Sequence, residues 1–245
     1  MKTLGLIGFG QFGRLAAEKL KPHFDILVTD VADRSAEAAA LGVAFGSLQD
    51  AARREIVIVA VPVMAMKATF EAMAPDLQPG ALVVDVGSVK VLPARWMLEA
   101  LPTHVDIVAT HPLFGPQSAI AGLEGQRLVI CPVRGDRHEK IAELAASFGL
   151  VPSITTPEEH DQEMAYVQAL THLIGRSLVN LGIPDEALKT TSYQHLLELC
   201  RLIGDDTFEL FTAIQTLNPY AAEVVGAFVG EAQGLLQQVK GERPS

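Results

Sequence analysis

Two polar residues stand at the ends of apolar runs. Ser88 follows residues 81–86 and His111 follows residues 105–110. Short runs rich in valine and isoleucine predict buried parallel strands. In a doubly wound sheet the carboxyl ends of such strands meet at the edge where ligands bind. An imidazole, with an ordinary pKa of ~6.5, is suited to take a proton near neutral pH. The sequence therefore predicts His111 as a general base.

A glycine-rich segment near the N-terminus supplies a second chemical feature. Residues 3–7 predict a strand, residues 8–13 read G-F-G-Q-F-G, and a helical pattern follows. In this setting the glycines make a tight turn that brings backbone N–H groups and a helix N-terminus to a pyrophosphate. We expect the cofactor residues to be Gly8, Phe9, Gly10, Gln11, Phe12, Gly13, Val61, Pro62 and Ser88.

The second predicted strand, residues 26–30, ends in Asp30. An acid there can accept hydrogen bonds from the adenosine ribose and would repel a 2′-phosphate, which favours NAD over NADP. Two alternatives remain open. Arg34 could bind a 2′-phosphate, so NADP stays possible, and Asp30 could merely cap the turn.

The elements that position these residues form two domains. Strand and helix patterns alternate over residues 1–155, with helices at 35–41, 64–74 and 137–148 and strands at 56–62 and 127–132. This alternation predicts an α/β domain with a Rossmann-type doubly wound sheet. We expect its core to include Met64, Met66, Phe70 and Met73.

The pattern changes at Thr156. Thr156, Pro157 and Glu159 form the signature of a capping box, which starts a helix that should run to about Leu181 and stop at Gly182. Only helical patterns follow, at roughly 193–202, 207–216 and 220–240. The prediction is a dinucleotide-binding domain at 1–155 and an all-α domain at 156–245.

The first helix of the second domain carries a polar face. Gln168, Thr171, His172 and Gly175 share one side by helical spacing. Such a face on an otherwise apolar helix borders a site or faces solvent, and for His172 the sequence does not choose between them.

Composition excludes several functions. The chain has 245 residues and a net charge of −10, and it has no stretch of clustered Lys and Arg. This argues against nucleic acid or an anionic membrane as a partner. No apolar run approaches the ~20 residues of a membrane span. The two cysteines do not have the spacing of metal ligands, so we expect no metal. Two cysteines without a disulfide pattern suit a reducing compartment, so we expect a cytoplasmic protein.

Five segments, taken in order, resemble prephenate/arogenate dehydrogenases of tyrosine biosynthesis. They are the glycine loop, D-V-G-S-V-K at 85–90, T-H-P-L-F-G-P at 110–116, E-H-D at 159–161 and Q-A-L-T-H at 168–172. The resemblance spans nearly the whole chain and is closest to the plant-type arogenate branch. It departs from that branch at Asp30, where the plant type tends to place Ser-Arg, and at Gly87.

The resemblance implies an oxidoreductase that acts on a CH–CH group by oxidative decarboxylation. Arogenate would yield tyrosine, and prephenate would yield 4-hydroxyphenylpyruvate, with NAD preferred over NADP. His111 would accept the hydroxyl proton of the substrate. Ser88 would hydrogen-bond the same hydroxyl or orient His111.

The resemblance also implies the substrate-binding residues. Arg201 lies where bacterial members carry a substrate-binding arginine, and Arg176 is the other candidate for a carboxylate. In the branch that the chain resembles, an acid at the position of Asp206 accompanies the use of arogenate. This carboxylate could favour the ammonium of arogenate, which prephenate lacks. Each of the three could instead be a solvated charge. The full predicted set is Gln168, Thr171, His172, Arg176, Arg201 and Asp206.

Two other readings compete with this one. A 3-hydroxyacid dehydrogenase of the same architecture would need a catalytic lysine on the interdomain helix, where this chain offers His172. A non-catalytic dinucleotide-sensing module would not need Ser88, His111 and His172 together.

The helical domain is small for the apolar surface it carries, which predicts a homodimer through this domain. The residues that it could not easily bury are Leu178, Val179, Leu196, Leu197, Phe211, Val225 and Phe228.

Overall fold

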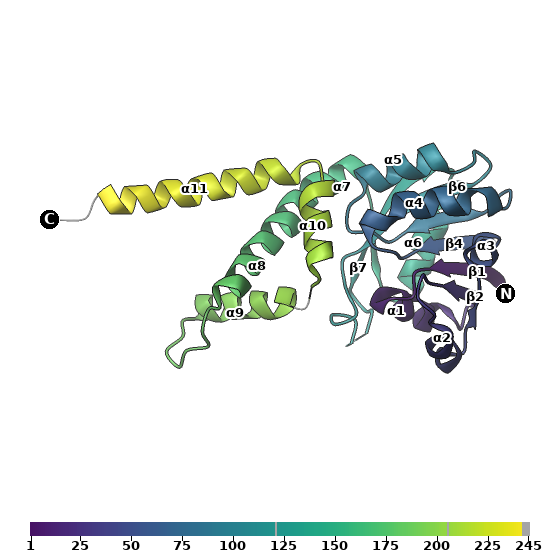
Figure 1. The fold of residues 1–245 in the computed structure, drawn as a ribbon, viewed down its shortest axis with the longest axis horizontal. Coiled ribbons are helices and arrows are strands. Elements are labelled where there is room, and N and C mark those ends of the chain that lie inside the picture. Colours follow the sequence, from purple (N-terminus) through teal and green to yellow (C-terminus); the bar gives the residue numbers. More distant parts are fainter. Residues whose placement is uncertain (121, 205, 242–245) are drawn as a thin grey trace. The chain divides into compact units, whose positions relative to one another are not determined.

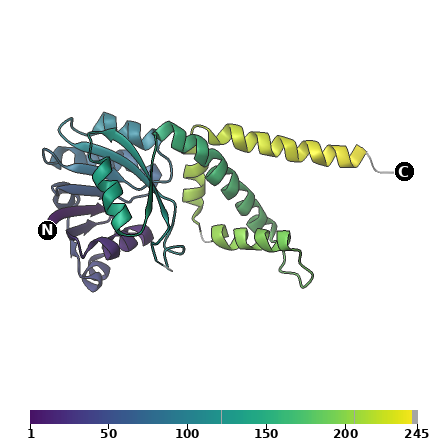
Figure 2. The same cartoon turned by 180° about the vertical axis from the view of Figure 1, so that it is seen from behind.

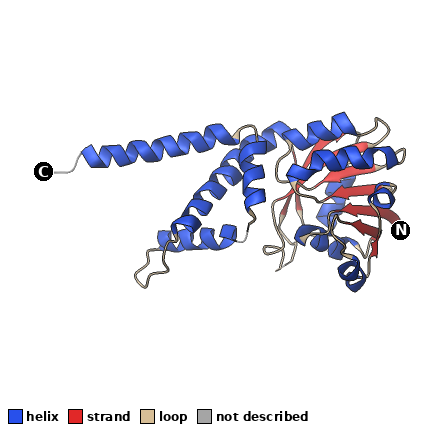
Figure 3. Ribbon diagram, viewed as in Figure 1, coloured by secondary structure: helices blue, strands red, loops and turns tan. Residues whose placement is uncertain are grey.

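A computed structural model describes residues 1–120, 122–204 and 206–241. They form two compact units, which divide inside a helix between His160 and Asp161. Figure 3 shows the described strands all within the first unit. In the part of the chain that the structure describes, no helix has both the length and the apolar character needed to cross a membrane.

The first unit is an eight-stranded sheet in the order β3-β2-β1-β4-β5-β6-β7-β8. Strands β1 to β6 are parallel, whereas β7 runs antiparallel to β6 and β8 runs parallel to β7. The strands are β1 Lys2–Ile7, β2 Phe24–Thr29, β3 Ala44–Phe45, β4 Ile56–Val59, β5 Leu82–Asp85, β6 Asp106–Pro112, β7 Arg127–Arg134 and β8 Val151–Ile154. The order and direction confirm the predicted doubly wound, mostly parallel sheet.

Helices cover both faces of this sheet. They are α1 Gln11–Leu20, α2 Ser35–Leu41, α3 Leu48–Ala52, α4 Val63–Met73, α5 Val91–Ala100 and α6 His138–Ser147, with a 3₁₀ turn at Ala74–Asp76. Figure 1 shows α4 and α5 over one face, and Figure 2 shows α6 on the other. Side chains along a strand point alternately to the two faces of the sheet, so each strand contributes to the apolar layers on both faces. Leu82 and Val84 pack toward α6, while Val83 is buried on the opposite face.

Local signals set the helix ends. Gly42 closes α2 in the left-handed region with φ 78°, and Ser47 with Asp50 forms a capping box at α3. Of the four residues expected in the core of α4, Met66, Phe70 and Met73 are fully buried. Met64 is 53% exposed, so its predicted core position is wrong: it lies on the outer side of the helix.

The second unit contains the continuation of one long helix and three more. The helices are α7 Pro157–Met164, a π-helical segment Ala165–Leu170, α8 Thr171–Leu181, α9 Thr191–Gly204, α10 Phe208–Leu217 and α11 Ala221–Gly241. The Thr156–Glu159 capping box starts α7, with both reciprocal hydrogen bonds present at 3.1 and 3.2 Å. Gly182 ends α8 with φ 68°. The small buried centre of this unit is Ala169, Ile214 and Ala221.

Candidate active site

The glycine loop is shaped for a close ligand. Gly8 has φ +98°, and a Cβ there would lie 2.5 Å from the carbonyl oxygen of Ala60. A Cβ on Gly13 would lie 2.1 Å from the carbonyl oxygen of Gly8. Gly10, the N-cap of α1, has open space where a Cβ would be. The loop therefore fits a pyrophosphate at the N-terminus of α1.

Asp30 fixes this loop to the end of β2. Its Oδ2 accepts the N–H of Phe9 at 2.7 Å, and its Oδ1 accepts the N–H of Ala32 at 3.0 Å. Arg34, the alternative partner for a 2′-phosphate, forms a 3.0 Å ion pair with Glu37 instead. The hydrogen bond from Arg34 lowers the pKa of the Glu37 carboxyl. The carboxylate of Asp30 thus lies at the end of β2, and the guanidinium of Arg34 is already paired with Glu37.

We expect Asp30→Ser to weaken discrimination against NADP, because the substitution removes the carboxylate that would repel a 2′-phosphate. The ratio of the dissociation constants for NADP and NAD, measured by titration calorimetry, checks this. Arg53→Ser, on an exposed residue outside the loop, is the control. An unchanged ratio in Asp30→Ser would show that Asp30 does not read the ribose.

Val61 and Pro62, which the sequence predicted to contact the cofactor, lie beyond β4. The strand was predicted to continue to Pro62, but it ends at Val59, and Pro62 is instead the N-cap of α4. The predicted strand is three residues too long, because the chain leaves the sheet to begin α4 at Val63.

Ser88 and His111 belong to neighbouring strands. Ser88 comes three residues after the end of β5; it is 8% exposed, and its buried Oγ has no hydrogen-bond partner in the described part of the chain. His111 was expected to follow its strand, but β6 continues through Pro112. The reason is β7, which pairs antiparallel with this end of β6 and places Val129 opposite His111.

A second histidine contacts the predicted base. The Nδ1 atom of His111 lies 2.9 Å from the Nε2 atom of His160, and the two side chains are 6% and 2% exposed. His160 lies on α7, inside the first unit. Its role was not predictable from the sequence, although it belongs to the E-H-D segment at 159–161. Only folding brings together two histidines that are 49 residues apart.

A buried ion pair underlies the same sheet edge and was also missed. Lys90 and Asp85 have fully buried side chains, and the ammonium of Lys90 contacts the Asp85 carboxylate. Burial raises the pKa of Asp85, and the charge of Lys90 is the largest influence in the opposite direction. Lysine is rarely buried without a partner, so its presence in an apolar segment was the available signal.

In the second unit the predicted polar face is partly rearranged. Gln168 lies in the π-helical segment, so α-helical spacing does not relate it to Thr171 and His172 as predicted. The Nε2 atom of Gln215 on α10 donates to the carbonyl of Ala169 in this segment at 2.8 Å. Gly175 is buried, and a Cβ there would lie 2.4 Å from Ile203.

His172, Arg176 and Asp206 form a cluster. The His172 Nδ1 atom is 3.6 Å from the Asp206 Oδ2 atom, and Arg176 donates to the backbone carbonyl of Asp206. The guanidinium of Arg176 also lies over the Phe211 ring, 5.9 Å from its centroid. The structure therefore brings together three of the six predicted substrate residues.

Polar atoms without partners lie along the same helix. Gln168 Oε1, His172 Nδ1 and Arg176 Nε are buried and make no hydrogen bond to the described residues. Buried polar atoms in folded proteins nearly always have a hydrogen-bond partner, so these three atoms are available to a bound molecule or water. Thr171 is half-buried beside them. Arg201 on α9 is exposed, and its guanidinium forms no hydrogen bond or ion pair with another described residue.

Burial lowers the pKa of His172 below its ordinary value of 6.5; Asp206 opposes this shift and Arg176 adds to it. The folded protein therefore resists a proton that the unfolded chain binds. This contribution to stability is complete above about pH 6.5 and is lost as the pH falls toward the folded pKa.

We expect the free energy of unfolding to fall between pH 7.5 and 5.5, and to fall less in His172→Asn. Urea denaturation at fixed protein concentration measures both. His195→Asn, on a side chain that is 71% exposed, is the matched control. If the free energy of unfolding fell equally in His172→Asn and in the parent, the lowered pKa of His172 would be contradicted.

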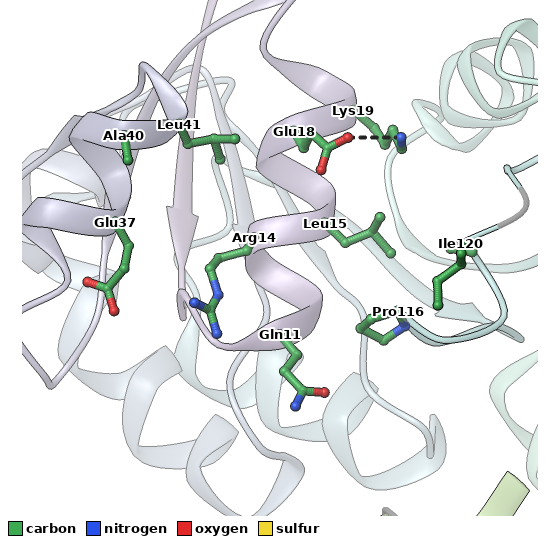
Figure 4. Close-up of a pocket in the computed structure, with 11 residues that line it drawn as sticks. Gln11, Arg14, Leu15, Glu18, Lys19, Glu37, Ala40, Leu41, Pro116 and Ile120 are labelled. Atoms are coloured by element: carbon green, nitrogen blue, oxygen red, sulfur yellow. Dashed lines mark hydrogen bonds and ion pairs between the residues drawn. The ribbon is translucent and has the colours of Figure 1, made fainter.

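A cavity of the first unit lies away from these residues. It has a volume of about 640 Å³ and extends across α1 between α2 and residues 116–120. Figure 4 shows Arg14, Glu37 and Ile120 around it, with Glu18 paired to Lys19. It borders the glycine loop only through Gln11 and includes neither Ser88 nor His111. The residues suited to chemistry therefore lie outside this cavity.

Comparison with known proteins agrees with both units. Residues 16–151 match the prephenate dehydrogenase nucleotide-binding domain, and residues 156–244 match the prephenate dehydrogenase dimerization domain. Arogenate dehydrogenase 1, chloroplastic, of Arabidopsis thaliana is 31% identical over 97% of this chain and 39% of its own length. A probable arogenate/prephenate dehydrogenase of Methanocaldococcus jannaschii is 29% identical over 97% of this chain and 57% of its own length.

The fold has solved counterparts as well. Prephenate dehydrogenase from Aquifex aeolicus, solved in complex with hydroxyphenyl propionate and NAD⁺, superposes with a TM-score of 0.79 at 20% identity. That match covers 99% of this chain and 92% of the other. The chain spans about two fifths and just under three fifths of the two curated relatives described above. On the matches of its two domains, the chain belongs to the prephenate dehydrogenase family.

Proposed function

We propose that the protein is an NAD-dependent dehydrogenase that oxidatively decarboxylates arogenate, prephenate or both in tyrosine biosynthesis. The observation that carries the proposal is the buried His111–His160 pair at the sheet edge that also carries Ser88. The glycine loop and Asp30 support NAD as the cofactor, and NADP remains the alternative.

His111 acts as the general base. For its Nε2 atom to take the hydroxyl proton of the substrate, its Nδ1 must carry a hydrogen and donate it to Nε2 of His160. His160 therefore acts on the substrate through His111 and is a positioning residue. The unpartnered hydroxyl of Ser88 can hydrogen-bond the same substrate oxygen.

The bound nicotinamide supplies the hydride acceptor. As His111 takes the hydroxyl proton, the carbinol carbon would give up its hydride to that acceptor and become a carbonyl carbon. The ring carboxylate would then leave as CO₂, and its bonding electrons would pass through the ring to the carbonyl oxygen, which takes up a proton and becomes a phenol hydroxyl. Loss of CO₂ makes the ring aromatic, so the reaction is driven in one direction. The residues of the first unit need only hold one proton and orient one hydroxyl.

The cluster on the second unit recognises the polar groups of the substrate. We assign Arg201 to a substrate carboxylate because its guanidinium has no bond to another described residue. Arg176 holds Asp206 in place through its backbone carbonyl. Gln168, Thr171 and His172 supply hydrogen bonds, and the Asp206 carboxylate favours the ammonium of arogenate over the keto group of prephenate.

A four-way assay tests the function. Prephenate and arogenate are each supplied with NAD and with NADP, and reduction of the cofactor is followed by absorbance. We expect turnover with NAD and a higher kcat/KM for arogenate. If 3-hydroxy acids were oxidised, and neither prephenate nor arogenate led to reduction of the cofactor, the proposal would be contradicted. That result would favour the 3-hydroxyacid dehydrogenase class.

We also propose that the protein lies in the cytoplasm, where its two free thiols stay reduced.

We further propose that it forms a homodimer through the helical unit. None of the seven apolar residues that the sequence predicted to be hard to bury is fully buried, and Leu196 and Phe228 are 38% and 39% exposed. The match of residues 156–244 to a dimerization domain supports association through this unit. Sedimentation equilibrium at micromolar concentration should give twice the chain mass, and a monomer mass would overturn this proposal.

A further inference from the structure

Lys90 is a fully buried charged side chain next to the proposed catalytic edge. Its side chain has no exposure to solvent, and its carboxylate partner Asp85 has none either. Its ammonium donates to Asp85 Oδ2 and to the backbone carbonyl of Thr110 at 2.6 Å. One cation therefore joins two neighbouring strand ends.

The two groups that Lys90 joins each precede a proposed catalytic residue. On the β5 side, Asp85 Oδ2 also accepts the N–H of Gly87 at 2.9 Å, and Ser88 is the next residue. On the β6 side, Thr110 is the residue before His111. The Thr110 hydroxyl closes the link by donating to the Asp85 carbonyl at 2.6 Å.

The backbone ladder between β5 and β6 does not extend to Thr110. The ladder between β5 and β6 ends at the pair Asp85–Ala109, one residue before Thr110. Beyond that pair β5 turns into the Ser88 loop, while β6 continues with β7 as its partner. The Thr110 carbonyl accepts from a side chain, at the point where the two strands part.

We propose that Lys90 is a positioning residue, whose ammonium fixes the Ser88 loop against the β6 segment that presents His111. The inference rests on the proposed function, because it concerns the geometry of that reaction. Stability alone does not explain the charges, since well-packed apolar residues in place of a buried ion pair are often neutral or stabilising. Displacement of a reacting group by ~1 Å can lower a rate ~10²-fold.

The test compares Lys90→Met with the double variant Asp85→Asn/Lys90→Met. The single variant leaves a buried carboxylate unpaired and should lose stability. The double variant removes both charges, and the amide oxygen introduced in place of the Asp85 carboxylate can still accept the Gly87 N–H. We expect the double variant to recover the melting temperature and to bind NAD as the parent does, while kcat stays ~10- to 100-fold low with little change in KM.

Two controls separate positioning from folding. Met73→Ala, in the fully buried core of α4, should lower the melting temperature without this loss of kcat. Nitrogen-15 NMR of the imidazoles should show altered His111 signals in the double variant and unaltered His195 signals. The NMR comparison also decides the inference if the parent turns over neither proposed substrate.

Recovery of kcat in the double variant, with His111 signals matching the parent, would overturn the role of Lys90. Parent inactivity on both cyclohexadienols would instead overturn the proposed function. In that case altered His111 signals would still support the positioning role, and unaltered signals would overturn it.

Discussion

Replacing His111 by alanine should lower kcat at least ~10²-fold, which is the size of effect expected for loss of a general base. The affinity for NAD should stay nearly unchanged, because the glycine loop and Asp30 follow other strands, β1 and β2, and are held by their own hydrogen bond. Steady-state kinetics and a calorimetric NAD titration measure the two quantities separately.

The control is His104→Ala, since His104 belongs to the same unit and bonds the Leu77 carbonyl, outside the proposed site. His160→Ala adds a graded comparison. It leaves the base in place without its partner, so its loss of kcat should be smaller than that of His111→Ala. Activity near that of the parent in His111→Ala would end the case for this mechanism.

The parts of the site that the sequence predicted depend on local rules. The glycine loop is recognisable because a strand, three spaced glycines and a helix follow one another without interruption. The ends of α2, α7 and α8 were predictable because Gly42, the Thr156–Glu159 box and Gly182 act on backbone groups within a few residues.

The parts that the sequence did not predict depend on pairing between distant segments. The extent of β6 through His111 and Pro112 is set by β7, whose antiparallel direction the apolar pattern does not encode. The contacts of His160 and Lys90 are with residues 49 and 20 positions away, respectively. The π-helical turn that carries Gln168 is invisible to a 3.6-residue period, which assumes uniform α-helix.

The two arginines of the second unit should respond differently to the same substitution. Arg201→Gln should raise KM for the substrate ~10- to 100-fold, because a charge-assisted bond to a carboxylate contributes ~1.5–3 kcal/mol. Its melting temperature should not change, since the exposed guanidinium bonds no other described residue. Steady-state kinetics and thermal melts of the same preparations provide both values.

Arg176→Gln should instead lower stability, because the half-buried guanidinium holds the Asp206 carbonyl and lies over Phe211. Loss of a hydrogen bond from a charged donor costs ~1.5–3 kcal/mol. Asp206 would then lose this anchor, so the preference for arogenate over prephenate should weaken along with stability. The reverse pattern, with Arg201→Gln silent and Arg176→Gln raising KM at unchanged stability, would reassign the carboxylate to Arg176 and leave Arg201 as a solvated surface charge.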